Sequence, residues 1–131
     1  MRDYDALARY VAGRETMPFR DGSENNDCCA YLAGAIAAQT GVNPLHRAGL
    51  RWTTARGGRR VIKRLGGLGA ALDSVLRPIP LSSAHRGDGG LVEGERAVFV
   101  VLIEDRMLSA PGDQGLVRYP RSRLLKAWSA E

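Results

Sequence analysis

Residues 26–41 read NDCCAYLAGAIAAQTG, and this stretch predicts a buried helix. Asp27 is a typical N-cap residue, and Gly41 is a typical stop after the last helical turn. Between them alanine and glycine occupy nearly every face of the helix, so neighbouring elements can approach it closely. We therefore expect this helix in the interior of the domain, with Cys28 in its first turn.

Capping residues and apolar spacing predict further helices on both sides of this stretch. One helix is expected at about residues 3–12, a short one opens at Asn43-Pro44, and another covers about residues 68–76. Thr54 can cap a further, basic helix that lies between the short helix at Asn43-Pro44 and the helix at residues 68–76. We expect Gly57-Gly58 to break or fray this basic helix and Gly66-Gly67 to end it.

The second half of the chain carries strand patterns. The apolar run AVFVVLI at residues 97–103 predicts a strand long enough for the centre of a sheet. Turn residues delimit shorter strands at about 91–92, 106–110 and 116–119, and residues 121–128 predict a final short helix. Helices followed by a small antiparallel meander predict one α+β domain over residues 1–131.

Composition excludes several classes of protein. The chain has 131 residues, of which 44% are hydrophobic and 25% charged, which is typical of globular proteins and not of disordered chains or coiled coils. No apolar run is long enough to span a bilayer, and the first residues lack an export signal. The two adjacent cysteines cannot form a disulfide framework, so we expect a reducing compartment.

Cys28 is a candidate nucleophile because of its position in the predicted helix. Unpaired N–H groups in a first turn carry partial positive charge, which favours the thiolate. Cysteine peptidases use such a thiol together with a histidine that accepts its proton. The alternative is that Cys28 and Cys29 are small side chains packed at a helix start.

Several short motifs occur in an order that resembles a known family. The strings MPF (17–19), NDCC (26–29) and TGVNP (40–44) are similar to those of small phage tail-cluster proteins, a family related to NlpC-like cysteine peptidases. The resemblance covers roughly residues 4–128. It includes Gly66-Gly67-Leu68, Arg86-Gly87-Asp88, Gly115-Leu116-Val117 and Ala127-Trp128.

The resemblance implies a papain-like fold of NlpC type, with Cys28 at the nucleophile position and Asp88 in the turn that opens the sheet. The general base of such peptidases is a histidine at the start of the following strand, which here reads RAVFV at residues 96–100. The chain has only His46 and His85. We do not expect His85 to be the base, because it precedes the turn.

The function expected from this resemblance is structural. We expect a catalytically inactive, peptidase-like component of the phage tail tip or of tail assembly, located in the virion and made in the host cytoplasm. Its partners would be other tail proteins, such as the tail hub and the tape measure, and no cofactor is expected. The first alternative is a peptidoglycan endopeptidase with Cys28 as nucleophile.

The net charge of +5 is concentrated in one basic segment between Gly41 and Leu72, which contains seven cations and no acid. We expect this segment to face solvent or an acidic partner. The second alternative is a nucleic-acid-binding accessory protein that uses this segment, although no base-reading motif accompanies it. The candidate partner-binding residues are Arg59, Arg60, Lys63 and Arg64.

Two further expectations concern the remaining site chemistry. Two adjacent cysteines and two distant histidines do not match the ligand spacing of a zinc site, so no metal is expected. Trp52 and Trp128 are expected to pack in the core or in an interface.

Overall fold

Helices precede strands along residues 2–131, the part of the chain that the computed structural model describes. The helices are α1 (Tyr4–Arg14), α2 (Cys28–Thr40), α3 (Pro44–Arg47), α4 (Ala55–Arg64) and α5 (Leu68–Val75). The strands are β1 (Arg77–Ile79), β2 (Gly89–Glu93), β3 (Val98–Ile103), β4 (Met107–Gly112), β5 (Gly115–Pro120) and β6 (Leu124–Ser129). This order confirms the predicted α+β class.

The strands form one antiparallel sheet with the order β1-β6-β2-β3-β4-β5. Strands β2 to β5 are the predicted meander, in which each strand pairs with the next. Strand β3 is flanked by β2 and β4, so the apolar run occupies a central position, as predicted. Strand β6 then returns to lie between β1 and β2.

Four predicted caps are present at helix starts. The side chains of Asp3, Asp27, Asn43 and Thr54 each accept a backbone N–H from the first turn of α1, α2, α3 and α4, respectively. Gly41 ends α2 in the left-handed conformation, with φ of 81°. Local capping chemistry therefore sets these boundaries.

The predicted final helix at residues 121–128 is wrong. Residues Arg121–Arg123 form a short 3-10 turn, η2, and the rest of the segment is β6. Strand β6 has a partner strand on each side, so its backbone groups are satisfied by non-local pairing. Its neighbour β1 includes Pro78 and was not predicted. A proline is tolerated there because β1 is an edge strand.

The predicted break in the basic helix at Gly57-Gly58 is also wrong, because α4 continues through both glycines. A Cβ atom on Gly58 would lie 2.9 Å from Nε1 of Trp52. Gly58 is therefore a contact point where α4 approaches the indole, and the packing offsets the low helix propensity of glycine.

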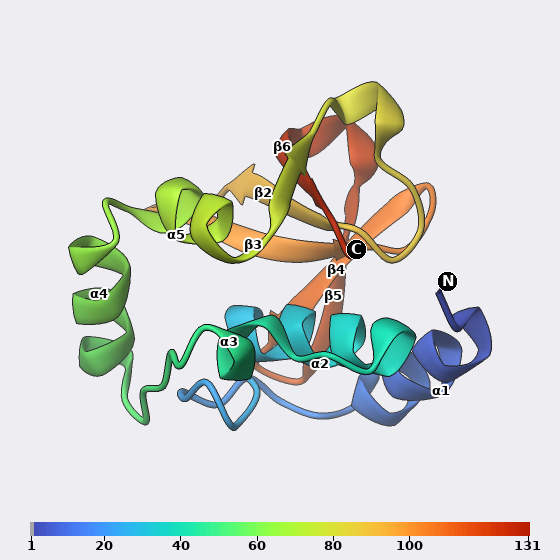
Figure 1. The fold of residues 1–131 in the computed structure, drawn as a ribbon. Coiled ribbons are helices and arrows are strands. Elements are labelled where there is room, and N and C mark those ends of the chain that lie inside the picture. The colour runs from blue at the N-terminus through green and yellow to red at the C-terminus, as the bar shows by residue number, and fades with distance from the viewer. Residues whose placement is uncertain (1) are drawn as a thin grey trace.

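Helices α1 and α2 lie on one face of the sheet, and α4 and α5 lie toward one end of it (Figure 1). Alternate residues of β3 belong to two different hydrophobic clusters, one on each face of the sheet. Val100 and Leu102 pack with α2, whereas Val101 and Ile103 belong to a cluster that does not include α2. The contact between α2 and β3 brings the start of α2 against the middle of the sheet.

Candidate functional site at the start of α2

Asp27 holds the first turn of α2 through both carboxylate oxygens. Its Oδ1 accepts the backbone N–H of Ala30 at 2.7 Å, and its Oδ2 accepts Nε1–H of Trp52 at 2.7 Å. Burial raises the pKa of Asp27, and these hydrogen bonds offset part of that shift. Asp27 therefore has a structural role beside Cys28.

The loop before α2 is fixed by Asn26. Its amide donates to the backbone oxygens of Met17 at 3.3 Å and of Pro18 at 3.0 Å. Its side-chain oxygen accepts from Arg14 at 2.9 Å. Because Asn26 is 1% exposed, this network sets the direction in which the chain enters α2.

Cys28 and Cys29 are free thiols that interact with each other. A hydrogen bond from Cys29 is the largest factor that lowers the pKa of the Cys28 thiol, and the backbone N–H of Val100 also lowers it. Donating that hydrogen bond raises the pKa of Cys29, and burial adds to this increase. Cys28 thus gains thiolate character from its neighbours.

The structure does not bring His85 to Cys28. The Gly87–Asp88 turn lies beside the last turn of α2, where Nε2 of Gln39 donates to the backbone oxygen of Gly87 at 2.9 Å. Cys28 lies eleven residues earlier in the same helix, which is about 16 Å along the helix axis at 1.5 Å per residue. His85 instead lies beside Asp88, with its Nδ1 3.3 Å from Oδ2 of that carboxylate.

His46 also has a different partner. Its Nε2 lies 2.7 Å from Oε1 of Glu24, and both side chains are about half exposed. Among residues 2–131, neither histidine is therefore placed as a base for the Cys28 thiol.

Comparison with known proteins identifies the family. A family model described as "Domain of unknown function (DUF6950)" matches residues 1–130. The chain belongs to the DUF6950 family. A search of curated proteins finds no match to this DUF6950 domain.

The basic residues singled out in the sequence lie on the outside of the DUF6950 domain. Arg59, Arg60, Lys63 and Arg64 are all exposed on α4, while Val61 on the same helix is buried. None of the ion pairs described for residues 2–131 includes these four side chains. They can therefore meet an acidic partner without breaking an internal contact.

Two contacts that matter for the DUF6950 domain were missed by sequence reasoning. Trp52 was expected in a core or an interface and is buried, but its hydrogen bond to Asp27 was not foreseen. Arg2 pairs with Asp88, which is 86 residues away in the sequence. No local pattern indicates either contact, because both join segments that only the fold brings together.

Within residues 2–131, no helix of the DUF6950 domain is both long enough and apolar enough to cross a membrane.

Proposed function

We propose that this DUF6950 domain is a non-catalytic structural component of a phage tail, at the tail tip or in tail assembly, with a peptidase-like fold of NlpC type. The motif resemblance supports this proposal. So does the placement of Cys28 at the start of a buried helix that packs on β3, since this is where the resemblance places a nucleophile.

The proposal that the domain lacks peptidase activity rests on the groups that surround the Cys28 thiol. Its neighbours are the thiol of Cys29, the backbone of Val100 and the carboxylate of Asp27. Both oxygens of Asp27 already accept hydrogen bonds from Ala30 and Trp52, and His85 lies near the opposite end of α2. A cysteine peptidase needs a base to take the thiol proton and to return a proton to the leaving amine. Loss of general acid–base catalysis costs about 10²- to 10⁴-fold in rate.

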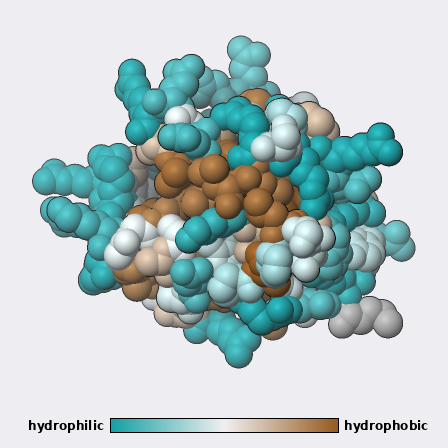
Figure 2. Space-filling view, turned by 90° about the horizontal axis from the view of Figure 1, so that it is seen from above, coloured by the Kyte–Doolittle hydropathy of each residue, from teal (hydrophilic) through white to brown (hydrophobic). Residues whose placement is uncertain are grey.

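Two surface features support a role in binding other proteins. The four exposed cations on α4 offer charge for an acidic neighbour, and arginine is suited to bidentate contacts with carboxylates. Seen from above, hydrophobic side chains form a continuous area surrounded by hydrophilic ones (Figure 2). Such areas are typical of protein interaction sites.

The test separates assembly from hydrolysis. Purified protein is incubated with peptidoglycan, and released peptide fragments are measured by mass spectrometry for wild type and for Cys28→Ala. We expect no release from either protein. In phage that carry Cys28→Ala, we expect tails of normal appearance in electron micrographs.

Cys28-dependent release of fragments would overturn the proposal in favour of the endopeptidase. The His85→Ala and His46→Ala variants would then show whether either histidine is the base. Normal tails in phage that lack the gene altogether would contradict the structural role.

A further inference from the structure

Five cations share one face of α4, which we call the α4 stripe. Arg56, Arg60 and Arg64 recur every four residues, and Arg59 and Lys63 form a second row beside them. Residues three and four apart lie on the same face of a helix, so this ten-residue helix carries a cationic stripe about 15 Å long. All five side chains are exposed.

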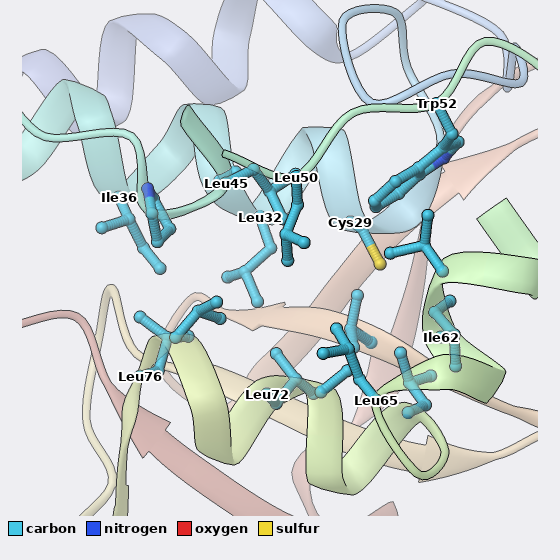
Figure 3. Close-up of a pocket in the computed structure, with 17 residues that line it drawn as sticks. Cys29, Leu32, Ile36, Leu45, Leu50, Trp52, Ile62, Leu65, Leu72 and Leu76 are labelled. Atoms are coloured by element: carbon cyan, nitrogen blue, oxygen red, sulfur yellow. The ribbon is translucent and has the colours of Figure 1, made fainter. Parts of the chain in front are cut away.

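The opposite face of α4 is apolar and is covered by the domain itself. Val61 is buried in a cluster with Trp52. Ile62 and Leu65 point toward the interior, where they face Cys29 and leucine side chains of α2 and α5 (Figure 3). The space that remains there is only about 40 Å³, which holds no more than a few water molecules. The stripe is therefore the face of α4 that a partner can reach.

The α4 stripe lacks an ion-pair partner in the part of the chain that the structure describes, residues 2–131. Like charges four residues apart destabilise a helix, and the stripe contains three such pairs, Arg56–Arg60, Arg59–Lys63 and Arg60–Arg64. Arg56 also lies in the first turn, where the helix dipole favours an acid. The free stripe therefore weakens its own helix.

The rest of α4 does little to offset this repulsion. The helix contains Gly57 and Gly58, which have low helix propensity, and it packs mainly on α5 and on Trp52. It lies at one side of the molecule, away from α1 (Figure 1). Carboxylates placed along the stripe would remove the repulsion, so an anionic partner would reinforce the helix that binds it.

We propose that the α4 stripe binds an acidic α-helix of a neighbouring protein, whose carboxylates four residues apart face Arg56, Arg60 and Arg64. Residues four apart are about 6 Å apart along any α-helix, so two helices side by side present cations and carboxylates with the same repeat. Arginine is suited to bidentate contacts with carboxylates. This inference rests on the proposed function, because it names the kind of segment by which a neighbouring tail protein meets α4.

The size and composition of the α4 stripe favour a helix over a nucleic acid. A helix is about 10 Å wide, so the stripe matches one helix in length and width. Protein–DNA interfaces bury about 1,000–2,500 Å² and add side chains that read base edges to those that meet phosphates. The stripe consists only of arginine and lysine, and Trp52, which packs against α4, is buried.

Two synthetic peptides of about sixteen residues, long enough to form a helix, test the repeat. Both consist of alanine, glutamine and glutamate in the same proportions. The first has a glutamate at every fourth position, and the second has its glutamates distributed around the helix. Calorimetric titration of the full chain at low salt should show one saturable site for the first peptide and binding at least about tenfold weaker for the second. Backbone amide hydrogen exchange in α4 should slow when the first peptide binds.

A charge swap locates the site. The triple variant Arg56→Glu/Arg60→Glu/Arg64→Glu should bind the first peptide at least about tenfold more weakly than the wild type. It should instead bind a peptide in which lysines replace the glutamates of the first, and the wild type should not. Circular dichroism checks that the variant folds, and the comparison of the two acidic peptides on the wild type tests the proposal even if it does not.

The matched control reverses three exposed arginines outside α4, in the variant Arg9→Glu/Arg96→Glu/Arg106→Glu. It has the same net charge as the α4 variant. Because exposed charges beyond a Debye length are largely screened, it should bind the first peptide within about threefold of the wild type. Equal weakening by the two triple variants would show that net charge, and not the stripe, attracts the peptide, and would overturn the proposal.

The proposal is also overturned if the wild type shows no saturable binding of the first peptide, or if it binds both acidic peptides equally. Tighter binding of a DNA duplex of about sixteen base pairs than of the first peptide would overturn it in favour of a nucleic acid. Phage that lack the gene test the proposed function separately. Defective tails without peptide binding would contradict only this inference, and normal tails with peptide binding would contradict only the proposed function.

Discussion

Arg2 and Asp88 form a buried ion pair, in which Nη2 lies 2.5 Å from Oδ1. Their side chains are 5% and 0% exposed. The Asp88 carboxylate also accepts the backbone N–H groups of His85 at 2.9 Å and of Ala130 at 3.0 Å. One carboxylate thus joins the residues before α1, the turn before β2 and the end of β6.

Asp88→Ala should therefore destabilise the domain strongly. The change removes the buried carboxylate that contacts Nη2 of Arg2, leaves this guanidinium with only the more distant carboxylate of Glu131, and frees two backbone donors. We therefore expect a loss of about 3–5 kcal/mol in the free energy of unfolding. Urea denaturation measures this loss. Asp113→Ala, at an exposed position in the turn after β4, is the control and should stay within about 0.5 kcal/mol. A loss below about 1 kcal/mol for Asp88→Ala would contradict this role.

The contact between Glu15 and Arg118 predicts a pH dependence of stability. Arg118 donates to both carboxylate oxygens of Glu15, at 2.5 and 2.9 Å, and this hydrogen bonding lowers the pKa of Glu15. The folded state therefore favours the ionised carboxylate. Its contribution is present above the unfolded pKa of about 4.3 and is lost as the pH falls through the lower folded value.

Glu15→Gln should consequently flatten the decline in unfolding free energy below about pH 4.3. Urea titrations at a series of acidic pH values measure this change. The effect is small because half of the Glu15 side chain is exposed. Glu95→Gln is a control on an exposed residue. An unchanged acid profile in Glu15→Gln would show that the pair contributes nothing.

Gly34→Ala should destabilise the crossing of α1 and α2. An added Cβ would lie 2.7 Å from Cζ of Tyr10, whose hydroxyl donates to the backbone oxygen of Tyr31. We expect a loss of about 1–3 kcal/mol in thermal or urea unfolding. Gly69→Ala in α5 has no atom within 4 Å of the added Cβ and should stabilise by about 0.5–1 kcal/mol. Equal effects at the two glycines would rule out this close packing.

Cys29→Ala should raise the pKa of the Cys28 thiol. The hydrogen bond from Cys29 is the largest factor that lowers this pKa, and alanine cannot donate it. Thiolate absorbance as a function of pH measures the shift, and Cys28→Ala shows which part of the titration belongs to Cys28. An unchanged titration in Cys29→Ala would mean that the helix terminus or the backbone of Val100, and not Cys29, sets the pKa of the Cys28 thiol.

Reversing the charge of Arg59, Arg60 and Arg64 to glutamate should impair tail assembly more than folding. These side chains are exposed, so each change should alter stability by no more than about 0.5 kcal/mol. Circular dichroism checks folding, and electron microscopy of phage that carry the variant checks assembly. Arg9, Arg96 and Arg106 changed together to glutamate provide the control with equal charge. The prediction is contradicted if the α4 variant forms normal tails or if it unfolds. Salt-dependent DNA binding by the wild-type protein would instead favour the nucleic-acid alternative.

Local chemistry made much of the fold predictable. Asp27 and Thr54 marked helix starts because capping depends on a few neighbouring residues, and the run at residues 97–103 marked a central strand because it is apolar throughout. Strand β6 was not predictable in this way. Its conformation depends on β1 and β2, which lie far from it in the sequence.

The candidate site was predictable only in part, for the same reason. The position of Cys28 in a first helical turn followed from the cap at Asp27. The separation of Cys28 from His85 did not, because it depends on which end of α2 meets the turn at Gly87.

The insertion of β6 between β1 and β2 has a consequence for biosynthesis. The strand that completes the sheet is the last of the six to leave the ribosome. Until it does, β2 presents unpaired backbone groups along one edge, and such an edge can pair with another chain. Nascent chains that stall before Leu124 should therefore need protection by chaperones until β6 is made and closes that edge.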